Sequence, residues 1–238
     1  MATADLQEKV PPLPFGDRSI PPLQAGDHLS REEFLRIWEL HPEIKRAELI
    51  GGMVYMPSPL SVEHGDMEGE IGGWLFAYKS RTPGTAVGHN ATSFFMADTP
   101  QADVHLRILT ECGGNSWTKD KYLAGTPELF VEICLSSAAY DLHQKFKLYQ
   151  SSGVPEYLTV LMFEREIRWH VLVNGAYQVM PPGADGLWRS RIFPGLWLDG
   201  PALLAGDSQR LLARLDEGLR STEHEAFVAK LAKARAKA

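Results

Sequence analysis

The sequence predicts an α/β or α+β domain in which a β-sheet is flanked by helices. Helical and strand-like hydrophobic patterns follow one another in the order helix, hairpin, helix, strands, helix, strands. With 44% apolar residues, a chain of 238 residues can bury the core of one domain. No apolar run approaches the roughly 18 residues that a membrane span requires, so we expect a soluble protein.

The first helix is expected directly after an extended N-terminal arm. Residues 1–28 contain five prolines and little periodicity, which is typical of an arm. The run Ser30-Arg-Glu-Glu33 has the form of a capping box, so a helix should begin here and end near His41-Pro42.

A hairpin and a long helix are expected next. Gly51-Gly52 lies between two strand-like runs, 46–50 and 53–56, and is a two-residue hairpin signal. From residue 62 to residue 81, apolar side chains recur at helical spacing.

The second half of the chain supplies most of the sheet. Asn174-Gly175 indicates a tight hairpin, and the last forty residues are helical, amphipathic and basic at their end. Strand-like segments lie at residues 92–97, 102–108, 128–135, 157–162, 168–173 and 176–180, and helical segments at 140–151 and 201–238.

Charge and cysteine content limit the function classes. The net charge of −6 argues against a protein that coats nucleic acid, because such binding relies on Lys and Arg neutralising phosphates. A DNA-cutting protein of this charge needs a local basic surface or metal ions at an acidic site. The two cysteines, Cys112 and Cys134, form no disulfide or Cys-x-x-Cys pattern, and the N-terminus lacks the apolar core of a secretion signal. Both observations favour the cytoplasm.

Two carboxylates on strand-like segments are the main candidates for a functional site. Glu132 shares one strand face with Phe130, in a segment that otherwise reads as buried on both faces. A buried carboxylate needs a partner, a metal or a changed protonation state, so Glu132 is either a metal ligand or part of a buried ion pair. Asp103 shares a polar strand face with His105, so Asp103 is either a metal ligand or a residue of an ordinary solvent-exposed strand face. If the two strands are neighbours, Asp103 and Glu132 can hold one cation, and Mg²⁺ takes one or two protein carboxylates.

Three further residues are weaker candidates. Lys145 borders the apolar stripe of its helix and could reach Glu132, although a surface ion pair with Asp141 is the alternative. His64 begins the second helix, where it could contact a metal or substrate, or cap the helix. Glu48 lies in the hairpin and could be structural.

The order of several motifs resembles one known family. The chain is similar to the Uma-type family, a branch of the PD-(D/E)XK nuclease superfamily described as restriction endonucleases. The similarity covers roughly residues 30–200 and is most specific over 127–157. The matching runs are Glu48-Leu-Ile-x-Gly52, Pro57-Ser-Pro59 with His64, the Asp103 strand, Pro127-Glu-Leu-Phe-Val-Glu132, Asp141-Leu-x-x-Lys145-x-x-x-Tyr149 and Gly153-Val-x-Glu-Tyr157.

The resemblance implies a restriction-endonuclease-like fold, a mixed central sheet flanked by helices, over residues 29–200, with residues 201–238 as a helical tail. It implies that Asp103 and Glu132 bind Mg²⁺, or Mn²⁺ in its place, as catalytic carboxylates. The chain departs from the superfamily pattern at two positions. Ala102 replaces the usual proline and Cys134 the usual lysine, so Lys145 would supply the missing charge from the following helix.

The function implied by the resemblance is a Mg²⁺-dependent endonuclease that hydrolyses phosphodiester bonds of DNA, working as a homodimer. One alternative is a catalytically degenerate nuclease-fold protein that serves as a nucleic-acid-binding or scaffold module. The acidic net charge and the two departures favour that alternative. A third reading is a metal-dependent phosphoesterase that acts on small substrates.

Overall fold

The computed structural model describes residues 20–56, 60–134 and 141–238, and the side chains of residues 141 and 142 are not among those described. Most of the predicted N-terminal arm (residues 1–19) and the motif at residues 57–59 lie outside the described residues. Within the described part of the chain, no helix is both long and apolar enough to cross a membrane.

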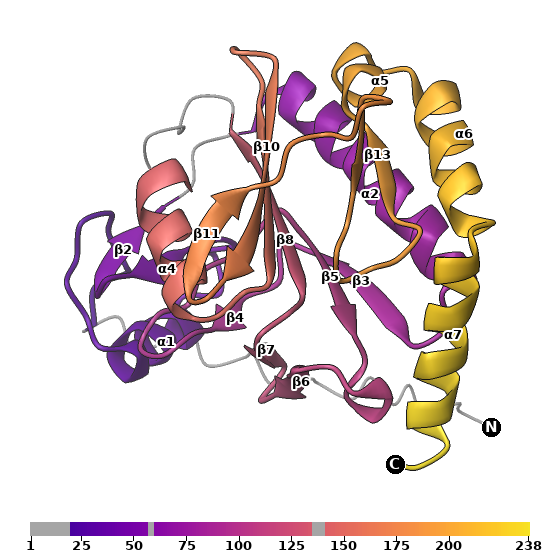
Figure 1. Cartoon of the computed structure of the whole chain (residues 1–238). Coiled ribbons are helices and arrows are strands. Elements are labelled where there is room, and N and C mark those ends of the chain that lie inside the picture. Colours follow the sequence, from indigo (N-terminus) through magenta and orange to yellow (C-terminus); the bar gives the residue numbers. More distant parts are fainter. Residues whose placement is uncertain (1–19, 57–59, 135–140) are drawn as a thin grey trace, which may run out of the picture.

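A six-stranded mixed sheet forms the centre of the molecule (Figure 1). Its strand order is β11-β10-β9-β8-β5-β3, in which β8 and β9 run parallel and the other neighbours run antiparallel. The strands are β3 (Thr85–His89), β5 (Val104–Ile108), β8 (Leu129–Cys134), β9 (Glu156–Leu161), β10 (Glu166–Val173) and β11 (Ala176–Val179). The sheet flanked by helices that the sequence predicts is confirmed.

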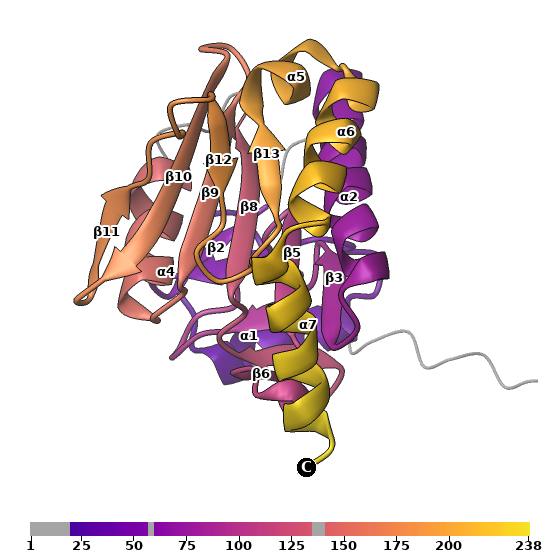
Figure 2. The ribbon, with the colours of Figure 1, turned by 45° about the vertical axis from the view of Figure 1, so that its right-hand side comes forward.

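One face of the sheet is covered by the long second helix and the C-terminal helices, which lie together in Figures 1 and 2. These elements are α2 (Val62–Arg81), α5 (Gly200–Ala205), α6 (Ser208–Leu219) and α7 (Thr222–Arg235), with the ribbon β12 (Leu187–Arg189) and β13 (Trp197–Asp199). Leucines of α5, α6 and α7 belong to the same hydrophobic cluster as the strands, so these helices share the core of the sheet.

The opposite face carries a second set of elements. They are α1 (Arg31–Leu40), the hairpin β1 (Glu48–Ile50) and β2 (Met53–Tyr55), the π-helical turn η2 (Asp141–Lys145) and α4 (Phe146–Ser151). The Ser30 capping box is present at the start of α1, and Gly51 and Gly52 turn the hairpin with φ angles of +60° and +74°. A 3₁₀ turn, η1 (Thr110–Cys112), and a small sheet of β4 (Ser93–Phe94), β7 (Tyr122–Gly125) and β6 (Ser116–Lys119) complete the fold.

Strand β8 contributes to both layers of the core. Leu129, Val131 and Ile133 belong to the cluster formed with α2, whereas Phe130 packs with Leu148 and Tyr149 of α4. The predicted alternation of the strand is therefore confirmed over its described length. Because its side chains alternate, Glu132 projects toward the α4 side.

Several predictions along the chain are wrong in detail. The strand expected at 92–97 stops at Phe94, because Phe95 and Asp98 bond to each other across a turn in which Met96 has a φ of +44°. Strands β3, β6, β7, β12 and β13 are not among the predicted elements, and the helix expected from residue 140 starts as the π-helical turn.

The polar strand face expected beside Asp103 is wrong at His105, whereas Asp103 and Arg107 are partly exposed. His105 is buried, and its ring packs edge-on against Phe130 at a centroid distance of 6.2 Å. Gly88 pairs with His105 across β3 and β5, and its missing side chain leaves room for the imidazole. Burial lowers the pKa of His105 to about 3, so the ring is neutral at physiological pH.

Candidate active site

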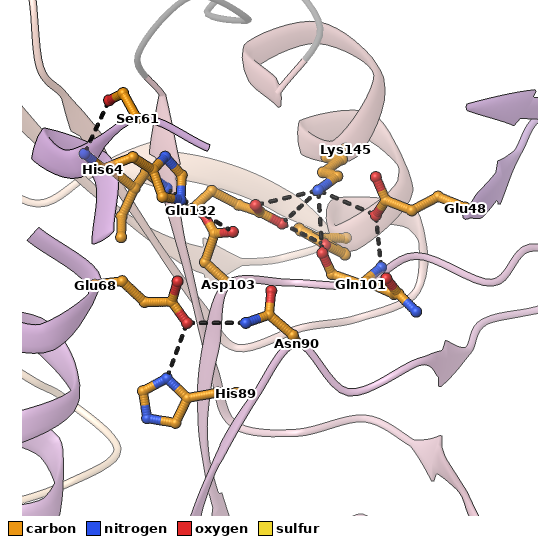
Figure 3. A network of polar contacts seen from close by, with 12 residues as sticks. Glu48, Ser61, His64, Glu68, His89, Asn90, Gln101, Asp103, Glu132 and Lys145 are labelled. Atoms are coloured by element: carbon orange, nitrogen blue, oxygen red, sulfur yellow. Dashed lines mark hydrogen bonds and ion pairs between the residues drawn. The ribbon is translucent and has the colours of Figure 1, made fainter. Parts of the chain in front are cut away.

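Asp103 and Glu132 lie side by side on neighbouring strands. Val104 pairs with Val131, and this antiparallel register brings the residue before β5 next to the central part of β8. Asp103 Oδ2 accepts a hydrogen bond of 2.7 Å from the backbone N–H of Ile133 (Figure 3). The aspartate is thereby fixed beside the strand that carries Glu132, so the condition under which both could hold one cation is met.

Lys145 reaches Glu132 in the interior. Its Nζ lies 3.1 Å from both carboxylate oxygens of Glu132, and the exposed fractions of the two residues are 4% and 2%. The Tyr149 hydroxyl donates a further hydrogen bond of 2.8 Å to Glu132 Oε1. The ion-pair interpretation of Glu132 is therefore confirmed, and its role as a metal ligand stays a prediction.

The helix geometry places Lys145 and Tyr149 on one face. Lys145 ends the π-helical turn and Tyr149 follows four residues later in α4, a spacing that stacks two side chains along a helix. Tyr149 also packs on Phe130 at a centroid distance of 4.8 Å. Burial, followed by the nearby Glu132 charge, raises the pKa of Tyr149 well above its ordinary value, so the hydroxyl remains a donor. By contrast, Lys147 is exposed.

Glu48 enters the site from the β1–β2 hairpin. Its Oε1 lies 3.1 Å from Lys145 Nζ and accepts a hydrogen bond of 2.6 Å from the backbone N–H of Gln101. The carbonyl oxygen of Gln101 in turn accepts a bond of 3.3 Å from Lys145 Nζ. The ammonium therefore lies between two carboxylates and one carbonyl (Figure 3).

His64 approaches Asp103 from α2. Its Nε2 lies 3.7 Å from Asp103 Oδ1, a distance for an ion pair rather than a hydrogen bond. Asp103 raises the pKa of His64, against the opposing effect of burial. The capping alternative for His64 is wrong, because Ser61 is the N-cap and its Oγ accepts the His64 backbone N–H.

A second polar group adjoins Asp103. Glu68 lies one helical turn after His64 and accepts hydrogen bonds from Asn90 Nδ2 (2.8 Å) and His89 Nδ1 (3.2 Å). The Asn90 backbone N–H donates to the carbonyl oxygen of Asp103. Sequence reasoning did not select Glu68 or Asn90. The spacing of four residues between His64 and Glu68 was the available signal.

Gln101 and Tyr149 were also not selected as site residues. Gln101 acts through its backbone, which no side-chain pattern reveals. Tyr149 stands four residues after Lys145 in one of the matching runs, and this spacing was the available signal. Within residues 20–56, 60–134 and 141–238, no group of three or more His, Cys, Asp or Glu side chains is arranged to hold a metal ion. The site instead offers the adjacent carboxylates Asp103 and Glu132.

The fold has a counterpart among solved structures. The chain is similar to a solved structure described as a putative nuclease belonging to DUF820 from Anabaena variabilis, with a TM-score of 0.55 and 12% sequence identity. The match covers 79% of this chain and 99% of that one. At this identity, the similarity is evidence of the shared fold.

The chain belongs to the Uma2 family, whose model is described as "Putative restriction endonuclease" and matches residues 31–201. This membership confirms the resemblance derived from the motifs. No curated protein matches the sequence.

Proposed function

We propose that this protein is a metal-dependent endonuclease that hydrolyses phosphodiester bonds of DNA in the cytoplasm. The family membership supports the nuclease class. The observation that carries the proposal is the adjacency of Asp103 and Glu132 across β5 and β8, with the Lys145 ammonium bound to Glu132. Two carboxylates and one ammonium are the groups that metal-assisted phosphodiester hydrolysis requires.

The residues fit a hard divalent cation. Two carboxylates, Glu48 and Glu132, contact Lys145, and Asp103 is held on the strand that carries Glu132. None of the three carboxylate side chains is more than 14% exposed. This excess of oxygen ligands with negative charge favours Mg²⁺ or Mn²⁺. Asp103 and Glu132 would hold the ion, which when bound lowers the pKa of its water and offsets negative charge at the phosphate.

The protein groups around these two carboxylates have separate tasks. The Ile133 N–H and the Tyr149 hydroxyl hold the carboxylates of Asp103 and Glu132 in place. Lys145 brings a compact positive charge that can orient the attacking water or stabilise the charge that develops on the phosphate. His64 stands beside Asp103 on the α2 side, where it can donate to a phosphate oxygen or a leaving group.

The test is cleavage of supercoiled plasmid DNA with Mg²⁺ by the wild type and by Asp103→Asn, Glu132→Gln and Lys147→Ala variants. We expect cleavage by the wild type and by the exposed-lysine control, and none by the two carboxylate variants. Full activity in either carboxylate variant would remove that residue from the site. Cleavage of model diesters without DNA cutting would instead favour a phosphoesterase acting on small substrates.

One observation favours the alternative of a degenerate nucleic-acid-binding or scaffold module. The Lys145–Glu132 pair satisfies the buried carboxylate with protein groups alone. The discriminating measurement is the melting temperature with and without Mg²⁺, because a ligand that binds only the folded state raises it. A catalytic site should show a rise that Asp103→Asn removes, whereas a scaffold should show none.

We also propose that the protein acts as a homodimer, in which two sites could address the two DNA strands. Analytical ultracentrifugation of the free protein and of its DNA complex tests this assembly. A monomer under both conditions would limit the enzyme to nicking one strand at a time.

A further inference from the structure

We propose that Glu48 is a positioning residue, which keeps the Lys145 ammonium in the site when the Glu132 carboxylate turns to a divalent cation. This inference rests on the proposed function. It assigns to the β1–β2 hairpin the task of holding the Lys145 ammonium while Asp103 and Glu132 bind the cation.

In the structure, Lys145 and a cation would use the same carboxylate. The ammonium lies at equal distances of 3.1 Å from both oxygens of Glu132, which is the placement of a counter-ion. A divalent cation held by Glu132 would share these oxygens with the lysine and would bring a like charge close to it, which would weaken the Glu132–Lys145 contact. An ammonium that is 4% exposed then needs another carboxylate, because an unpaired buried charge is costly.

Glu48 provides that second carboxylate. Its Oε1 is already 3.1 Å from Lys145 Nζ, and the Gln101 carbonyl at 3.3 Å adds a second acceptor. With both contacts kept, the lysine can release Glu132 without leaving the interior. The ammonium then remains beside the ion and the phosphate, where the proposed reaction needs it.

The Glu48 carboxylate has contacts of its own that do not involve the Glu132 side chain. Its carboxylate is held by the Gln101 N–H at 2.6 Å. The hairpin that carries it is tied to the following loop by the bond from Thr99 N–H to the Leu49 carbonyl and by the bond from Gly51 N–H to Asp98. Movement of the Glu132 side chain therefore leaves this anchor in place.

If Glu48 loses its charge, Lys145 loses the attraction of one carboxylate and competes more strongly with the ion for Glu132. The variant Glu48→Gln is suited to test this, because its amide oxygen can still accept from the Gln101 N–H while the negative charge is gone. In this variant, metal binding should weaken because Lys145 competes more strongly with the ion for the Glu132 carboxylate. If Lys145 is also replaced, Glu48→Gln should cause a smaller decrease in Mg²⁺ affinity.

The experiment is a double-mutant cycle on Mg²⁺ affinity, measured by calorimetry on the wild type, Glu48→Gln, Lys145→Met and the double variant. We expect Glu48→Gln to weaken Mg²⁺ binding about tenfold more in the presence of Lys145 than in the Lys145→Met background. Circular dichroism and the melting temperature of each metal-free variant show that all four are folded.

Equal losses in both backgrounds would overturn the proposal, since Glu48 would then act on the ion directly. No loss in either background, or no Mg²⁺ binding by any of the four proteins, would also overturn it. With any of these results, DNA cleavage that is lost in the Asp103→Asn and Glu132→Gln variants would still support the proposed function. Only the role of Glu48 would then be refuted.

Discussion

Replacing Lys145 by methionine should destabilise the metal-free protein, because it removes a positive charge that contacts two largely buried carboxylates. Removing one partner of a buried ion pair costs about 3–5 kcal/mol. Glu48 is 12% exposed and keeps its bond to Gln101, and Glu132 keeps the bond from Tyr149. We therefore expect the lower end of this range, about 3 kcal/mol, which corresponds to a decrease of roughly 6–12 °C in melting temperature for a chain of this size.

Urea unfolding, monitored by tryptophan fluorescence in the presence of a chelator that removes divalent ions, measures this loss of stability. Lys147→Met is the matched control, because Lys147 lies two residues away and is exposed. Its effect should stay within about 0.5 kcal/mol. Addition of Mg²⁺ should restore part of the stability of the Lys145→Met variant, since the ion can replace the lost positive charge.

Equal free energies of unfolding for Lys145→Met and Lys147→Met would refute this reasoning. The Lys145–Glu132 contact would then contribute nothing that water could not replace. A large loss that Mg²⁺ does not reduce would keep the ion pair but contradict a cation site at Glu132.

Three further predictions concern residues other than Lys145. Burial raises the pKa of Glu156 from 4.5 to about 7, so between these pH values the folded protein holds a proton that the unfolded chain releases. The free energy of unfolding should therefore fall by up to about 3 kcal/mol as the pH rises from 4.5 to above 7. Urea unfolding at a series of pH values measures this fall, which should be smaller in the Glu156→Gln variant. Tyr149→Phe keeps the ring packing but removes the donor to Glu132, which should cost about 1.5–3 kcal/mol in urea, and an unchanged midpoint would show that the hydroxyl is dispensable. Gly88→Ala places a Cβ on the His105 ring, so calorimetric unfolding should show a loss of about 1–3 kcal/mol, and a neutral result would mean that the ring can move aside.

The sequence by itself determined the local elements and the direction of their side chains. The capping box at Ser30 starts α1, the spacing over residues 62–81 forms α2, and Asn174-Gly175 turns β10 into β11 with positive φ at both residues. These features depend on neighbours within a few residues, so the pattern contains them. The same holds for the alternation that turns Glu132 away from the α2 side of β8.

The tertiary structure decided which of these residues meet. Glu48, Asp103, Glu132 and Lys145 come from four separate segments, and their contacts depend on strand order, on the register of Val104 with Val131 and on the path of the π-helical turn. None of these is encoded within a local window, because strand pairing is selected by the whole core. For the same reason, His105 is buried although its pattern predicts a polar face: the space for its ring is provided by Gly88, on a strand that the pattern does not reveal.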